Sequence, residues 1–123
     1  MDKRFRVLVA DDSAFARRIT VTSLANSEFD VVAEAKTDLE AIQKYKELAP
    51  DVVLLDIIMP EEGGTRALKD IIAINPKVRI VMLSSLGTEE AITESLSLGA
   101  ATFLQKPFDS AGLLGTLRKI VGT

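Results

Sequence analysis

The residues of this chain best suited to chemistry are acidic and follow apolar runs. The run VLVA at residues 7–10 leads into Asp11 and Asp12, and the run VVLL at residues 52–55 leads into Asp56. Adjacent carboxylates repel, and holding them at a buried strand end costs free energy unless a cation offsets it. Converging carboxylates without histidine or cysteine suit a hard divalent cation with oxygen ligands, and Mg²⁺ fits best because substrate phosphate often completes its coordination.

Two further residue types stand at the ends of later apolar runs. Ser84 ends the segment RIVMLS, and Lys106 follows the segment ATFLQ. A lysine supplies a point charge and a hydroxyl supplies a hydrogen bond, and these groups hold the oxygens of a phosphoryl group. Together with the carboxylates, these residues indicate phosphoryl transfer.

Composition narrows the chemistry. The 123 residues include no histidine and no cysteine, which excludes zinc sites of the Cys/His type, Ser-His-Asp triads and cysteine nucleophiles. The formal net charge of −3 and the pI near 5.0 give no electrostatic footprint for nucleic acid. No apolar stretch reaches the roughly 20 residues of a membrane span, and the N-terminus does not read as a signal peptide. We expect a cytoplasmic protein that binds neither nucleic acid nor membrane.

Alternating strands and helices must position these side chains. Strands are predicted for five segments rich in β-branched residues, at 5–11, 30–35, 51–56, 79–84 and 101–105. Helical patterns fill the gaps: Ser13, Thr37 and Thr88 are predicted N-caps, the first helix covers 13–26, and Asn75-Pro76 ends the third. Near-continuous apolar runs are typical of strands covered on both faces. The pattern predicts a single domain over 1–123 with a (βα)5 doubly wound, parallel five-stranded sheet.

In such a sheet, ligands bind beyond the carboxyl ends of the strands. Taken singly, each candidate has a simple structural explanation. Asp12 is a possible helix cap, Asp56 a solvated strand end, Ser84 a common strand-end serine and Lys106 a solvated lysine. Because all of them fall at one edge of the sheet in chain order, the functional interpretation is favoured.

The ordered set of motifs resembles the receiver domains of two-component response regulators, in particular the chemotaxis-type (CheY-like) branch. The resemblance covers the whole chain and implies a flavodoxin-like fold. It implies a signalling phosphoacceptor that assists only its own phosphorylation and dephosphorylation, not an enzyme that turns over substrate. The segments that carry it are DDSAFARR (11–18), DVVLLDIIMP (51–60), Gly64, MLSS (82–85), LGA (98–100) and FLQKPF (103–108).

The resemblance implies a role for each residue that matches the family motif. Asp56 would be the phosphoacceptor, whose carboxylate attacks phosphorus to give an aspartyl phosphate. Lys106 would pair with the phosphoryl group. Ser84 would be the hydroxyl that moves to bond the phosphoryl group, and Phe103 the aromatic residue that rotates inward as it does so. The bond between Lys106 and the proline after it is cis in the family. Mg²⁺ would be held by Asp11, Asp12, Asp56 and the backbone carbonyl of Ile58.

The resemblance also implies partners. A sensor histidine kinase or a small acyl phosphate would donate the phosphoryl group, and a downstream protein would bind the face made by the fourth helix, the fifth strand and the fifth helix. The protein would be a monomer or a phosphorylation-dependent dimer. Two alternatives remain open. One is a Mg²⁺-dependent phosphohydrolase with an aspartyl nucleophile, although Asp56 lacks the second aspartate of a DxD motif. The other is an interaction module that works without phosphorylation.

The loop after Asp56 departs from the family pattern. It reads IIMPEEGGT at residues 57–65. The family usually has an apolar residue in place of Glu62, an Asp or Asn in place of Gly63 and an apolar residue in place of Thr65. Because two glycines adjoin, the sequence predicts a more mobile start of the third helix.

Two other positions near the acceptor are apolar in this chain. Ile58 and Leu86 stand where many relatives carry polar groups that orient the attacking water. Since a water without hydrogen-bonding partners is poorly placed for in-line attack, we predict slow self-dephosphorylation. Arg17 and Arg18 are interpreted as a solvated helix face and are given no role.

Overall fold

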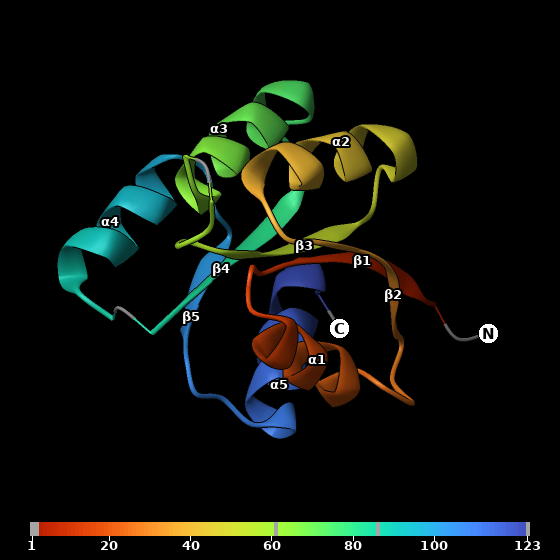
Figure 1. Cartoon of the computed structure of the whole chain (residues 1–123). Helices are drawn as coiled ribbons and strands as arrows, with labels where there is room; N and C mark the ends of the chain where they lie inside the picture. Colours follow the sequence, from red (N-terminus) through yellow and green to blue (C-terminus); the bar gives the residue numbers. More distant parts are fainter. Residues whose placement is uncertain (1–2, 61, 86, 123) are drawn as a thin grey trace.

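The computed structural model describes residues 3–60, 62–85 and 87–122, and in this part of the chain five strands alternate with five helices (Figure 1). All strand pairs are parallel, in the order β2-β1-β3-β4-β5. The strands are β1 (Phe5–Ala10), β2 (Phe29–Ala35), β3 (Val52–Asp56), β4 (Arg79–Ser84) and β5 (Thr102–Gln105). The helices are α1 (Ala14–Ser23), α2 (Asp38–Leu48), α3 (Gly64–Ile74), α4 (Glu89–Ser97) and α5 (Ser110–Val121). The predicted (βα)5 architecture is confirmed.

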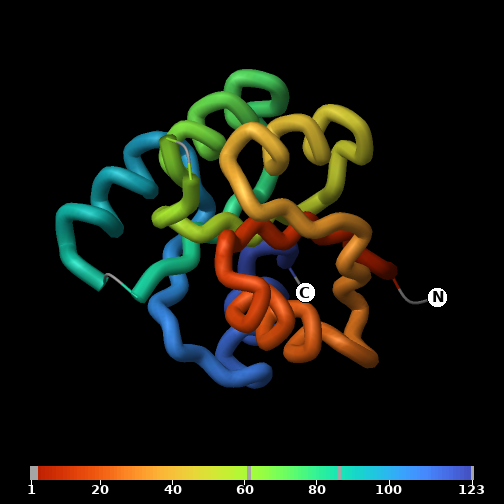
Figure 2. Tube along the Cα trace, in the orientation of Figure 1, coloured from red at the N-terminus to blue at the C-terminus, as the bar shows by residue number. Residues whose placement is uncertain are grey.

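Two hydrophobic cores lie on opposite faces of the sheet, because side chains alternate along each strand. Leu8 and Val53 belong to the core covered by α2, α3 and α4, whereas Val7 and Leu54 belong to the core covered by α1 and α5. The trace in Figure 2 shows that α1 and α5, from opposite ends of the chain, lie side by side. Every residue of β3 is buried, which explains its unbroken apolar run.

The three predicted N-caps are confirmed. The hydroxyl oxygens of Ser13, Thr37 and Thr88 each accept a hydrogen bond from the backbone N–H three residues further along. The predicted first helix was too long, because α1 ends at Ser23 and the backbone N–H groups that follow bond three residues back and tighten the last turn. Strand β1 ends at Ala10, one residue earlier than predicted.

The sheet edge at the carboxyl ends of the strands carries the candidate site. Strand β1 lies between β2 and β3, so the strand order reverses beside it, and a crevice forms where connections leave to opposite faces. Asp11 and Asp56 stand at this point. Over the described ranges, no helix has both the length and the apolar character needed to cross a membrane.

Candidate functional site

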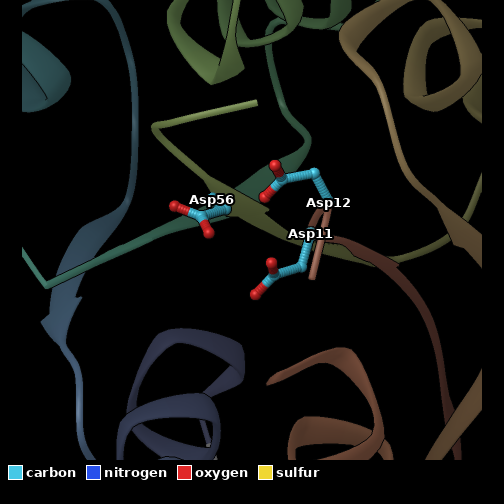
Figure 3. Close-up of side chains that lie close together, drawn as sticks. All are labelled: Asp11, Asp12 and Asp56. Atoms are coloured by element: carbon cyan, nitrogen blue, oxygen red, sulfur yellow. The ribbon is translucent and has the colours of Figure 1, made fainter. Parts of the chain in front are cut away.

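Three carboxylates converge at the carboxyl ends of β1 and β3. Asp11 and Asp12 follow β1, Asp56 ends β3, and one carboxylate oxygen from each lies within 4.8 Å of the others (Figure 3). Asp11 is 1% exposed and Asp56 is 7% exposed, whereas Asp12 is exposed. This donor set consists only of oxygen atoms and carries three negative charges, so it fits a hard divalent cation such as Mg²⁺.

Lys106 lies between the two buried carboxylates. Its Nζ is 2.6 Å from Asp11 Oδ2 and 2.9 Å from Asp56 Oδ2. The strand end that carries it is held in place, because the Lys106 N–H donates to the Ser84 carbonyl at 2.9 Å. The Lys106–Pro107 peptide bond is cis, as the resemblance implies. One ammonium against three carboxylates leaves the cluster with excess negative charge.

Backbone N–H groups orient the remaining carboxylate oxygens. Asp11 Oδ1 accepts a hydrogen bond from the Ser13 N–H at 3.0 Å, and Asp56 Oδ1 accepts one from the Ile58 N–H at 3.2 Å. Each buried carboxylate therefore has one oxygen on the backbone and one on the Lys106 ammonium. Their positions are defined before any ligand binds.

Burial and charge shift the two titrating groups at the centre of the site. Burial raises the pKa of Asp56 above its ordinary value, and the hydrogen bond from Lys106 opposes this rise without cancelling it. For Lys106, burial alone would lower the pKa, but the hydrogen bonds with Asp11 and Asp56 outweigh burial and raise it. The lysine therefore stays charged beside a carboxylate whose ionised form is disfavoured by burial.

The two predicted switch residues lie on the neighbouring strands β4 and β5. Ser84 is the last residue of β4, is 1% exposed and lies at the same sheet edge as Asp56. Phe103 pairs with Met82 within the sheet and packs, partly buried, against the core under α2, α3 and α4. The roles of both residues remain predictions.

Of the two apolar positions predicted to slow dephosphorylation, only Ile58 lies within the described residues. Ile58 follows Asp56 by two residues, and its side chain is 55% exposed beside the site. Leu86 lies outside the described residues.

Backbone packing and conformation explain the two adjacent glycines, Gly63 and Gly64, in the loop after Asp56. A Cβ at Gly64 would lie 1.9 Å from the Asp56 carbonyl oxygen, which only glycine avoids, and Gly63 has a φ of +88°. The Gly64 N–H also donates to the Ile57 carbonyl at 2.8 Å. The first turn of α3 thus lies directly against the backbone of Asp56. That this start is unusually mobile remains a prediction.

Asp38 is a buried acidic residue near the site that no sequence motif marks. Its side chain is 0% exposed, and its Oδ2 accepts a hydrogen bond from the Glu62 N–H at 3.2 Å. Its own N–H donates to the Pro60 carbonyl at 3.3 Å. These bonds fasten the loop after Asp56 to the start of α2. An acidic residue in a first helical turn is common, so nothing in the sequence marked this contact.

The interpretation of both arginines as a solvated face is wrong for Arg17. The Arg17 side chain is 13% exposed, with its Nη1 2.8 Å from the Asp11 carbonyl oxygen and its Nε 2.8 Å from Glu34 Oε1. Arg18 is exposed, as expected. Helical periodicity cannot distinguish these neighbours, because the contact depends on where the end of β2 lies.

Comparison with known proteins identifies the class to which this fold and site belong. Residues 7–118 match the model of the response regulator receiver domain, and the chain belongs to this family. Its relatives include a chemotaxis protein CheY from Thermotoga maritima, which is 38% identical over 115 residues that cover 94% of this chain and 96% of the relative. The predicted family, its chemotaxis-type relatives and the fold are confirmed.

A second relative in sequence and a solved structure are also similar to this chain. A protein-glutamate methylesterase/protein-glutamine glutaminase from Caldanaerobacter subterraneus is 46% identical over 116 residues, which cover 92% of this chain and 31% of that protein. A chain in the crystal structure of the CheX–CheY–BeF3–Mg²⁺ complex from Borrelia burgdorferi superposes with a TM-score of 0.93 at 33% identity, covering 97% of this chain and 90% of that chain.

Proposed function

We propose that this protein is a phosphorylation-operated switch in which Asp56 accepts a phosphoryl group in a Mg²⁺-dependent reaction. The donor would be a phosphohistidine of a sensor histidine kinase or a small acyl phosphate. The observation that best supports this proposal is the cluster itself, where three carboxylate oxygens lie within 4.8 Å and Lys106 bonds two of the three carboxylates. The protein would assist its own phosphorylation and dephosphorylation without turning over a substrate.

The proposed reaction uses an ionised oxygen of Asp56 as nucleophile. This oxygen bonds to phosphorus while the bond from phosphorus to the donor nitrogen or oxygen breaks, and the donor leaves with that electron pair. Mg²⁺, held by Asp11, Asp12, Asp56 and the Ile58 carbonyl, would neutralise charge on the phosphoryl oxygens. Lys106 Nζ, 2.9 Å from Asp56 Oδ2, needs only a small movement to bond a phosphoryl oxygen instead.

The proposed output is a change of surface. Phosphorylation adds negative charge and strong acceptor oxygens at Asp56, and the hydroxyl of Ser84 at the same sheet edge would move toward them. Phe103 would then move into the space that becomes available. A downstream protein would read the altered face of α4, β5 and α5, and the chain would act as a monomer or as a phosphorylation-dependent dimer.

An apolar groove beside the site supports a protein as phosphoryl donor. It lies between α1 and the start of the β5–α5 connection, and its lining includes Phe15, Ile19, Lys106, Pro107 and Phe108. Phe15 is 77% exposed and Ile19 is 42% exposed. Large apolar side chains this exposed next to a reactive centre are suited to contact a partner that brings its phosphohistidine to Asp56.

The test is phosphorylation with a small donor. The protein is incubated with acetyl phosphate and Mg²⁺, quenched and analysed by intact mass spectrometry. We expect one added phosphoryl group, which is lost with a chelator and in Asp56→Asn. It should be retained in Asp51→Asn, a matched control at the residue directly before the same strand. No gain in wild type, under conditions that phosphorylate another receiver domain, would contradict the proposal.

A further inference from the structure

The side chain of Arg17 in α1 contacts both the acidic site and the neighbouring strand β2. We propose that Arg17 is a positioning residue for Mg²⁺ binding, because it fixes the peptide plane between Asp11 and Asp12. This inference rests on the proposed function, since it assumes that the three carboxylates bind Mg²⁺. It adds a residue that contacts no carboxylate of the site and acts through the backbone.

The Asp11 residue is held at every polar group. Its N–H donates to the Ala35 carbonyl at 3.0 Å, and its carbonyl oxygen accepts from Arg17 Nη1 at 2.8 Å. Its two carboxylate oxygens bond the Ser13 N–H and Lys106 Nζ. Of these contacts, only the one from Arg17 acts on the carbonyl that belongs to the next peptide unit.

That peptide unit determines where Asp12 points. A peptide bond is planar, so an anchored Asp11 carbonyl also fixes the N–H and Cα of Asp12. The Asp12 side chain is exposed, and among the described residues no hydrogen bond or ion pair holds its carboxylate. Its direction toward Asp56, visible in Figure 3, therefore depends on the backbone. Without the Arg17 contact, Asp12 would sample orientations that take its oxygen away from the cation.

Glu34 orients the guanidinium. Arg17 Nε donates to Glu34 Oε1 at 2.8 Å, and Glu34 pairs with Val9 near the end of β2. The planar fork of an arginine holds two acceptors on different nitrogens at fixed relative positions, whereas a lysine presents a single ammonium on a flexible stem. The Arg17 side chain is only 13% exposed, whereas that of Glu34 is 48% exposed, so the arginine is the partner that is largely shielded from solvent. Arg17 therefore ties the ends of β1 and β2 together.

A purely electrostatic role predicts the opposite effect on metal affinity. Arg17 carries a positive charge near a site for a cation, so removal of this charge alone would tighten Mg²⁺ binding. Loss of positioning would weaken it. Arg18, the next residue, has the same charge, is exposed and has no ion pair within the described part of the chain. It is a matched control for the charge.

The experiment is calorimetric titration of MgCl₂ into wild type, Arg17→Ala, Arg17→Lys and Arg18→Ala, at pH 7 and constant salt, with folding of each checked by circular dichroism. We expect Arg17→Ala to raise the Kd for Mg²⁺ about tenfold, in the range for removal of a residue that orients metal ligands. Arg17→Lys should lie between wild type and Arg17→Ala, and Arg18→Ala should bind as wild type or slightly tighter.

The possible failures are distinguishable. If wild type binds Mg²⁺ while a folded Arg17→Ala binds it equally well or more tightly, the positioning role is refuted and the proposed function stands. If wild type does not bind Mg²⁺, both proposals fail. Should Arg17→Ala not fold, Arg17→Lys serves instead, because it keeps the positive charge and loses the planar fork. We expect Arg17→Lys to raise the Kd relative to wild type, and an unchanged Kd would refute the role.

Discussion

Replacing Asp56 by asparagine should stabilise the Mg²⁺-free protein, although it removes a salt bridge. One oxygen of each carboxylate lies within 4.8 Å of the others, and two unit charges at this upper bound repel by about 1 kcal/mol in water and by about 3 kcal/mol at an effective dielectric constant of 20. Asp56 has two such neighbours, whereas Lys106 attracts it at 2.9 Å. These terms nearly cancel, so the cost of burying an ionised carboxylate decides the sign. We expect a gain of about 1 kcal/mol for Asp56→Asn at pH 7.

The pH dependence of this gain follows from the raised pKa of Asp56. Since the folded carboxyl binds its proton more tightly than the unfolded one, wild type gains stability relative to Asp56→Asn as the pH falls through the folded pKa. Below the unfolded value of about 4, both side chains are neutral and the difference should vanish. Mg²⁺ should reverse the order, because a ligand at a hundred times its Kd stabilises wild type by about 2.7 kcal/mol.

The assay is urea unfolding, followed by circular dichroism in chelator at pH 7 and pH 4, and in Mg²⁺ at pH 7. Glu90→Gln, an exposed acid on α4, is the control for net charge and should change stability by less than about 0.5 kcal/mol. The reasoning is refuted if Asp56→Asn is less stable than wild type in chelator at pH 7. It is equally refuted if the difference is the same at pH 4 and pH 7.

Three other predictions concern the stability of the fold and the rate of dephosphorylation. Gly115→Ala in α5, where a Cβ meets nothing within 4 Å, should raise the unfolding free energy by about 0.5–1 kcal/mol. Gly64→Ala should lower it severely, because its Cβ would lie 1.9 Å from a backbone oxygen. Equal urea midpoints for the two variants would contradict this contrast. Asp38→Ala leaves the Glu62 N–H without its buried acceptor and should lower the unfolding free energy by about 1–3 kcal/mol in the same assay. A decrease below about 0.5 kcal/mol would show that this hydrogen bond is not needed for stability. Ile58→Asn should speed loss of phosphate from the acyl-phosphorylated protein, measured by intact mass over time, and an unchanged decay rate would contradict a role for the apolar side chain.

Most of the fold was predictable because burial imposes a simple pattern. Strand β3 is buried at every position, and this alone produces the run VVLL that identifies it. The carboxyl ends of parallel strands meet at one edge, so Asp11, Asp56 and Lys106 could be placed together although up to 95 residues separate them. The N-caps were visible because they depend on residues three positions apart.

The remaining features depend on distances between segments that no local pattern encodes. Arg17 and Arg18 are adjacent arginines on one helix. Only the position of Glu34 on β2 shows which of them forms an ion pair. In the sequence, Asp38 looks like an ordinary acidic residue at the start of a helix. Only the fold shows that it bonds the backbone of the loop after Asp56. Gly64 has the sequence signature of a turn residue, but its lack of a side chain makes room for the backbone of Asp56.

The central claim is that Asp56 carries the phosphoryl group, and the most direct measurement locates that group. The protein is phosphorylated with acetyl phosphate and Mg²⁺, reduced with borohydride, which converts an aspartyl phosphate into homoserine, then digested and sequenced by mass spectrometry. We predict homoserine at position 56 alone, and none when Mg²⁺ is chelated. Homoserine at position 11 or 12, or an unreduced Asp56 in protein that has gained a phosphoryl group, would contradict the account.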